Sequence, residues 1–244
     1  MYLGHLKEMR YNKTMKKAFT LMELIFVIIV IAILSAVMIP NFENNSLKQA
    51  AQQVAADIRY TQHLALINDR YNPQDLNGTG SVKWYKTRWQ ILFSANAGSA
   101  ESNGGTPQVA YTVFSDNSNN STGNPDESEV AFVPGNPSHR MTGGYNSSNT
   151  LRYWHANFVG LKRMNLGIAY SISSVSFSGT CGASTRLAFD YIGRPIKGNL
   201  RFDTNSYMNS DLLTSDCNIT LAHDNGDTII LTVKPETGYV KVNY

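Results

Sequence analysis

Glu23 is the one ionisable residue in the run FTLMELIFVIIVIAILSAVMIP, which extends from Phe19 to Pro40. A carboxylate among apolar residues costs several kcal/mol unless it is paired or kept neutral, so its position predicts a functional role. The alternative is that the side chain extends past the end of the apolar run to a polar surface.

Two further sets of residues could do chemistry. Cys181 and Cys217 are the only two cysteines. A bridge between them would stabilise the fold by about 3–4 kcal/mol on the chain-entropy model, and the alternative is two buried free thiols. Neither has a Cys or His at metal-ligand spacing. The histidines are scattered, and no HExxH, Gly-x-Ser-x-Gly or phosphate loop is present, so we expect no enzyme, no cofactor and no metal. Those downstream of the apolar run are His63, His139, His155 and His223.

Short Asp/Asn runs supply oxygen atoms of the hardness that calcium prefers. One set lies between Asp203 and Asp211 and the other between Asp224 and Asp227. Neither has EF-hand spacing, and such runs are usually turns, so both are expected to be structural.

A basic, aromatic-bearing group near the C-terminus could contact DNA. It comprises Arg186, Arg194, Lys197 and Arg201, with Tyr191 and Phe202 among them. The alternative is solvated charge beside the turn at Gly193. Residues 1–18 hold five of the 21 basic and one of the 18 acidic residues, which leaves 16 basic and 17 acidic residues, a net charge of −1. This balance argues against nucleic acid as a partner.

The apolar run has the length of a membrane helix. Residues 19–39 would extend about 31 Å as a helix, close to the thickness of the hydrocarbon core. The run is apolar all round, so such a helix must be buried in lipid or in other helices. Lys16 and Lys17 precede it and no small-x-small cleavage site follows it, so we expect it to be retained, with a cytoplasmic N-terminus. The remainder would lie outside the cytoplasm, where cysteines can be oxidised.

The string KKAFTLMEL at residues 16–24, with the apolar run closed by Pro40, resembles the N-terminus of type IV prepilins and type II secretion pseudopilins. The resemblance implies that a prepilin peptidase cuts between Ala18 and Phe19 and methylates the new amine. It also implies that Glu23 pairs with the amine of a neighbouring subunit. The family usually has Gly before the cut, whereas this chain has Ala18. Translation could begin at Met1 or at Met15.

After Pro40, which should kink the helix, a polar helical pattern resumes. Asn44–Ser46 could form a break or cap, and Pro73 would stop the pattern after about Asn68. The predicted stem, 41–70, has an apolar stripe that should pack against a sheet, and the alternative is a partner-binding face. The stripe comprises Leu47, Ala51, Val54, Ile58 and Ala65.

Residues 71–244 predict an antiparallel β domain, because short β-branched and aromatic runs alternate with turn residues. Hairpin turns are expected at Asp224–Asp227 and Pro235–Gly238. Polar loops that are either functional tips or disordered are expected at Ser94–Thr106, Ser115–Glu129 and Pro134–Thr150. The expected strands are Val82–Phe93, Val109–Phe114, Val130–Val133, Leu151–Val159, Leu166–Ile172, Val175–Ser178, Thr185–Asp190, Asn218–His223, Thr228–Lys234 and Tyr239–Asn243.

Several segments resemble the GspH/FimT-type minor pseudopilins, namely residues 55–70, Arg88–Phe93, Phe189–Pro195 and Thr237–Val240. The expected fold is therefore α+β and pilin-like, with a leader at 1–18, a membrane helix at 19–40, an amphipathic stem at 41–70 and a β-rich periplasmic domain at 71–244. The expected function is that of a minor subunit in a type II secretion pseudopilus or a type IV pilus. Its partners would be the peptidase, sibling subunits, the assembly platform and the inner membrane, with secreted cargo a further candidate. The alternatives are a DNA-binding minor pilin that acts in DNA uptake, and an anchored periplasmic binding domain that is never cleaved.

Overall fold

The computed structural model describes residues 19–72, 83–95, 97, 108–117, 122–145, 150–182, 184–204 and 211–244, with only the backbone at 37–45. The expected leader, with Ala18, lies outside these residues. The chain divides into two compact units, residues 1–43 and 44–244, and each is considered by itself.

Helix α1 runs from Leu21 to Ile67, so the backbone stays helical through Pro40 and through Asn44–Ser46. The prediction of a break at Asn44–Ser46 was therefore wrong, and the apolar stripe beyond it explains why the helix continues. Within the residues that the structure describes, no helix is both long enough and apolar enough to cross a membrane.

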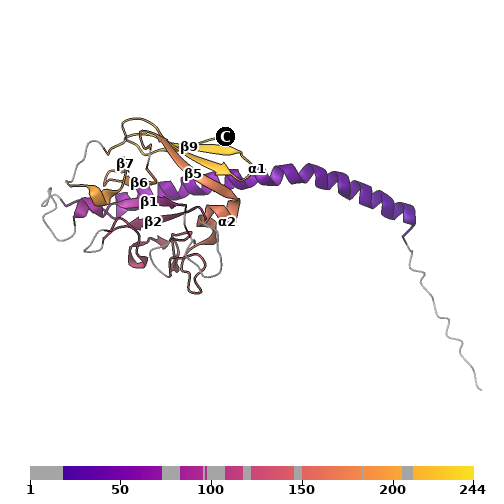
Figure 1. The fold of residues 1–244 in the computed structure, drawn as a ribbon, viewed down its shortest axis with the longest axis horizontal. Helices are drawn as coiled ribbons and strands as arrows, with labels where there is room; N and C mark the ends of the chain where they lie inside the picture. The colour runs from indigo at the N-terminus through magenta and orange to yellow at the C-terminus, as the bar shows by residue number, and fades with distance from the viewer. Residues whose placement is uncertain are drawn as a thin grey trace, which may run out of the picture. The chain divides into compact units, whose positions relative to one another are not determined.

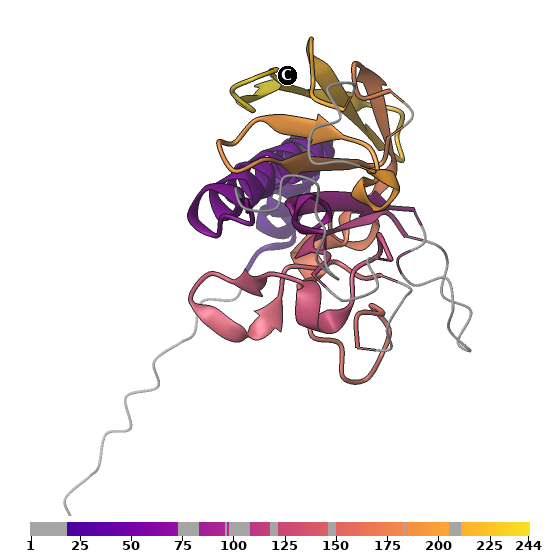
Figure 2. The ribbon, with the colours of Figure 1, turned by 90° about the vertical axis from the view of Figure 1, so that its left-hand side faces the viewer.

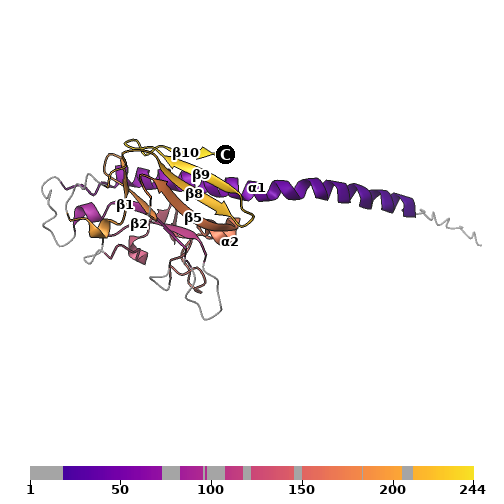
Figure 3. The same cartoon turned by 45° about the horizontal axis from the view of Figure 1, so that its top comes forward.

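The described residues of the second unit form two antiparallel four-stranded sheets and a small β-ribbon, and the strands labelled in Figures 1 and 3 belong to the two larger sheets. The first sheet has the order β2 (Ala110–Ser115), β1 (Trp89–Ser94), β6 (Arg186–Phe189) and β7 (Pro195–Lys197). The second has the order β10 (Val240–Asn243), β9 (Thr228–Val233), β8 (Cys217–His223) and β5 (Ile172–Gly179). The ribbon pairs β3 (Phe132–Val133) with β4 (Asn136–Arg140) and lies away from the C-terminal strands (Figure 2). The fold is thus α+β with antiparallel sheets.

Short helical turns connect these strands. They are η1 (Trp84–Lys86), η2 (Glu127–Glu129), η3 (Lys162–Met164), η4 (Leu200–Phe202) and the one-turn helix α2 (Leu166–Tyr170).

The predicted stripe on the stem is confirmed. Leu47, Ala51, Val54, Ile58 and Ala65 are all buried in one core with residues of both four-stranded sheets. Among the sheet residues of this core are Ile91 of β1, Leu187 of β6 and Leu221 of β8. The C-terminal half of α1 therefore buries its apolar face inside the second unit, which is the packing that the sequence predicts.

The two predicted hairpin turns are also confirmed. Gly226 has φ 95° between β8 and β9, and Gly238 has φ 63° between β9 and β10. A positive φ is readily adopted by glycine, which explains why each of these turns contains a glycine at this position.

Two predicted strands were wrong. Leu166–Ile172 begins as α2, because Asn165 caps it by accepting the Ile168 N–H at 3.0 Å. Leu151–Val159 is a series of turns, in which the N–H groups of His155 and Phe158 donate to carbonyls three residues earlier. Its aromatic residues suggested a strand but pack on one another instead.

Other boundaries differ from expectation. The start of Val82–Phe93 is η1, and Val82 itself lies outside the described residues. Strands β4 and β7 were missed, because Asn136–Arg140 and Pro195–Lys197 contain little β-propensity. These two segments become strands because they pair with β3 and β6, so tertiary contacts and not local propensity determine their conformation. The presence of β4 also corrects the expected loop at Pro134–Thr150.

Candidate functional site

The first turns of α1 expose an almost uniformly apolar surface. Every large apolar side chain from Phe19 to Leu34 is exposed, from 41% at Val30 to 80% at Phe19. Burying these side chains would be favourable by on the order of 20 kcal/mol. Such a surface requires an apolar environment, and no described residue of the first unit provides one.

The start of α1 is capped by Thr20. The Glu23 N–H donates to the Thr20 side-chain hydroxyl at 3.2 Å and lies 3.1 Å from its carbonyl oxygen. Glu23 therefore occupies the third helical position, where the positive end of the helix dipole favours a carboxylate. The spacing Thr-x-x-Glu is that of a capping box, a sequence signal that could have predicted where the helix starts.

Ser35 is the next polar residue along this surface. Its hydroxyl donates to the Ile31 carbonyl at 2.7 Å, so its hydrogen-bonding demand is met within the helix. The apolar surface is thus interrupted only near its first turn, at Thr20 and Glu23. The side chain of Pro40 lies outside the described residues.

A buried carboxylate ties the C-terminal half of α1 to the rest of the second unit. Asp57 is 6% exposed and accepts hydrogen bonds from Gln53 at 2.7 Å and from the Tyr111 hydroxyl of β2 at 2.6 Å. Arg163 of η3 lies 3.4 Å away. Burial raises the pKa of Asp57, while these partners oppose the rise. Asp57 was not identified from the sequence, although it adjoins the buried stripe at Ile58.

Cys181 and Cys217 form a disulfide with their Cα atoms 5.2 Å apart. This is the pairing that the sequence predicts. Cys217 begins β8 opposite Gly179, the last residue of β5, so the bridge holds the end of β5 against β8.

The four basic residues proposed for DNA contact do not present one free phosphate-binding surface. Arg186 is buried and donates to the Gly123 carbonyl at 2.5 Å. Arg194 forms an ion pair with Asp190 at 2.7 Å. Lys197 is half-buried in β7, and Arg201 is exposed beside Phe202. The structure therefore uses Arg186 and Arg194 to hold turns in place.

Two buried carboxylates titrate in an unusual range. Burial raises the pKa of Asp116 to about 6, although the Gly123 N–H donates to it at 2.6 Å. Burial and the nearby Asp211 raise the pKa of Asp203 to about 6.

Neither calcium candidate gains support from the structure. Asn205 lies outside the described residues, and Asn225 and Asp227 bond to each other within their turn. Among the described residues no cluster of His, Cys, Asp or Glu could hold a metal ion.

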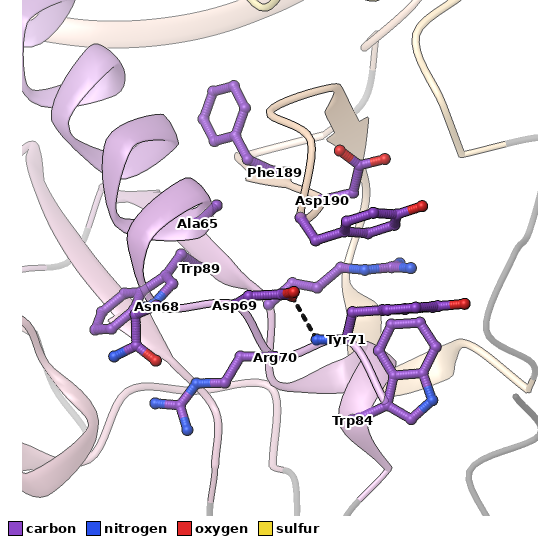
Figure 4. A pocket seen from close by; sticks show the side chains of 11 residues that line it. Ala65, Asn68, Asp69, Arg70, Tyr71, Trp84, Trp89, Phe189 and Asp190 are labelled. Atoms are coloured by element: carbon purple, nitrogen blue, oxygen red, sulfur yellow. Dashed lines mark hydrogen bonds between the residues drawn. The ribbon is translucent and has the colours of Figure 1, made fainter. Parts of the chain in front are cut away.

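A small cavity lies where α1 ends (Figure 4). It is walled by Tyr71, which stacks on Tyr191 at 4.5 Å between ring centroids and meets Trp84 edge-on at 5.0 Å. Its volume of about 10 Å³ suits a single water molecule rather than a ligand. We therefore assign this cavity to packing.

The candidate functional feature is thus the exposed apolar surface at Phe19–Leu34 with Glu23 near its start. Comparison with protein-family models, with curated proteins and with solved structures finds no match for this chain.

Proposed function

We propose that this chain is a minor pilin-like subunit of a type II secretion pseudopilus or a type IV pilus. Its N-terminal helix is inserted in the inner membrane, with the leader cytoplasmic and the β-rich domain periplasmic. A prepilin peptidase removes residues 1–18, and the helix then packs against those of sibling subunits as the fibre grows.

The observation that carries this proposal is the exposure of every large apolar side chain from Phe19 to Leu34. A membrane and a bundle of similar helices both supply the apolar contact that this surface requires. A subunit that is stored in lipid and then moves into a fibre uses the same surface twice. The basic residues before Phe19 support the orientation.

Glu23 gives the assembly its register. Glu23 belongs to the first turn of α1, four residues after Phe19, whose amine would become free on cleavage. The amine of a neighbouring subunit is the cation that would pair with it and keep the charge compensated away from water. Pairing at one defined height along the helix would fix the axial offset between neighbours.

The second unit acts as a rigid head, because its core holds the stem, and both Asp57 and the disulfide tie it together. DNA uptake remains the alternative function, but two of the four basic residues that suggested it are engaged within the fold. A gel shift at low and moderate salt checks this alternative, since phosphate contacts weaken as salt rises.

Mass spectrometry of the chain isolated from membranes that contain the peptidase tests the proposal. The expected N-terminus is a methylated Phe19. Replacing Phe19–Leu24 by an unrelated apolar sequence provides the control, which should insert but keep its leader. An intact leader on the unaltered chain would refute the proposal and favour a permanently anchored binding domain.

A further inference from the structure

A basic groove lies between the C-terminal half of α1 and the edge strand β10, and its volume is about 310 Å³. Arg59 of α1 and Lys241 of β10 line it, together with Tyr239 and Tyr244. None of the described residues that line this groove is acidic. The groove is therefore positively charged.

Hydrogen bonds join the two walls of the basic groove. Arg59 donates to the Val240 carbonyl at 2.8 Å, and Gln52 donates to the Tyr244 hydroxyl at 3.1 Å. Arg59 and Lys241 are both exposed, and neither belongs to an ion pair of the described residues. Two cations that are already in place and have no counter-ion favour an anionic ligand.

The chain itself carries a complementary acidic surface at η2. Asp126, Glu127 and Glu129 place three carboxylates within four residues, which is the densest run of acids in the sequence. Glu129 is buried, whereas Asp126 is exposed and Glu127 is half-buried. Asp126 and Glu127 are therefore the two carboxylates that a partner can reach. We call these two residues the acidic turn.

The basic groove and the acidic turn lie on opposite sides of the second unit. Strand β10 is one edge of the second sheet, whereas β2, an edge of the first sheet, is bridged through Phe114 to Val130, the residue that follows η2. Figure 2 shows the yellow C-terminal strands and the pink segment around η2 on opposite sides of this unit. One copy therefore cannot bring its own acidic turn to its own groove.

We propose that the basic groove binds the acidic turn of a second copy of this chain, with Asp126 and Glu127 facing Arg59 and Lys241. Charge complementarity selects this occupant, because a second copy brings the matching acids wherever the groove is present. Two basic grooves would repel each other, so a symmetric contact through this surface is disfavoured. The contact is head-to-tail, and each copy keeps one groove and one acidic turn for further copies.

The contact should be weak in dilute solution, because exposed ion pairs contribute only about 0.2–1 kcal/mol each and are screened by salt. It should become significant where copies are concentrated, as on a membrane surface. The inference does not depend on the proposed function, because the contact requires neither cleavage nor a fibre.

Cysteine crosslinking of two differently tagged full-length copies in membranes tests the contact. The two natural cysteines are bonded to each other, so each substitution adds one free thiol. One copy carries Tyr239→Cys in the groove and the other carries Ser128→Cys in η2. The matched control replaces Tyr239→Cys by Asn225→Cys, in an exposed turn outside the groove. The mixed dimer should be several-fold more abundant for the groove pair. Equal yields, no mixed dimer, or adducts with other proteins alone would overturn the inference.

Charge substitutions show whether the acids and the cations face each other. Lys241→Glu in the groove copy should lower the yield of mixed dimer by about two- to fivefold, whereas Lys241→Arg should not. Asp126→Lys in the partner copy should restore the yield that Lys241→Glu loses. Because Asp126 also caps η2, salt provides a second measurement without this substitution. Raising the salt concentration should lower the yield of the groove pair and not that of the control. Lack of restoration together with insensitivity to salt would overturn the inference.

The head-to-tail arrangement has its own test. A single copy that carries both Tyr239→Cys and Ser128→Cys should give dimers, trimers and longer adducts on oxidation, because every copy offers both surfaces. Copies with Tyr239→Cys alone should give few dimers. Dimers as the only product of the double variant would contradict a head-to-tail contact.

Discussion

The two halves of α1 use apolar residues in opposite ways. From Leu47 to Ala65 the apolar side chains form a stripe that is buried against two sheets of the same chain. From Phe19 to Leu34 they cover the helix and are exposed. The N-terminal half, Phe19–Leu34, therefore depends on an apolar partner that the described chain does not supply. The apolar side chains of the C-terminal half are already buried by the fold. Substitutions in the two halves should thus affect different properties.

The largest expected effect concerns Glu23. Glu23→Ala should leave membrane insertion intact but weaken co-assembly by about 3–5 kcal/mol, because a buried amine would lose its partner. Glu23→Gln retains hydrogen bonding without the charge, so its co-assembly should be intermediate between that of the unaltered chain and that of Glu23→Ala. Pull-down of tagged sibling subunits measures the effect. Normal incorporation of Glu23→Ala into the assembly with sibling subunits would show that Glu23 does not pair with a neighbouring amine.

A matched pair of core and surface substitutions sharpens the comparison between the halves. Ile58→Ala should lower the free energy of unfolding of the second unit by about 2–5 kcal/mol, because Ile58 is fully buried. Ile28→Ala should leave that free energy unchanged. Denaturant unfolding of both variants in detergent checks this. Equal destabilisation would show that the two halves are not energetically distinct.

The disulfide should also contribute to the free energy of unfolding of the second unit. Replacing both Cys181 and Cys217 with serine should lower the free energy of unfolding by about 3 kcal/mol, since the bridge restricts the unfolded chain. Denaturant unfolding of this variant, compared with the unaltered chain under non-reducing conditions, gives the value. An unchanged midpoint would contradict a stabilising role for the bridge.

The smallest predicted effect is a dependence of stability on pH. The pKa of Asp116 is raised from 3.8 to about 6, so the folded state holds this proton more tightly than the unfolded state does. The resulting stabilisation is complete below pH about 4 and is lost as pH rises through about 6, with a magnitude of about 1–2 kcal/mol. Asp116→Asn should flatten this part of the unfolding profile, whereas Asp224→Asn, in an exposed turn, should not. Identical profiles for the three chains would exclude the effect.

Local signals predicted much of this fold. The buried stripe on the stem, the turns at Gly226 and Gly238, and strands rich in β-branched residues such as β8 and β9 could be predicted from spacing and residue type. Strand β4, with the sequence NPSHR, could not, because its pairing with β3 overrides its low propensity. The segment at Leu166 failed for the opposite reason, since a single cap at Asn165 outweighed its apolar character.

The candidate site was predicted unevenly. Glu23 is conspicuous because nothing around it is charged, and the cysteine pair follows from there being two. The partners of Arg186 and Arg194 come from distant parts of the chain or from a turn, so their internal roles are visible only in the fold. Asp57 likewise depends on Tyr111, which is far away in sequence.

The central claim is that sibling helices cover the exposed half of α1. Val30→Cys, placed on that surface, tests it most directly when it is oxidised in membranes that contain the peptidase and the sibling subunits. The account predicts covalent adducts with siblings carrying a cysteine at the matching helix position, and none when cleavage before Phe19 is blocked. Adducts that form equally well without cleavage, or none at all, would contradict it.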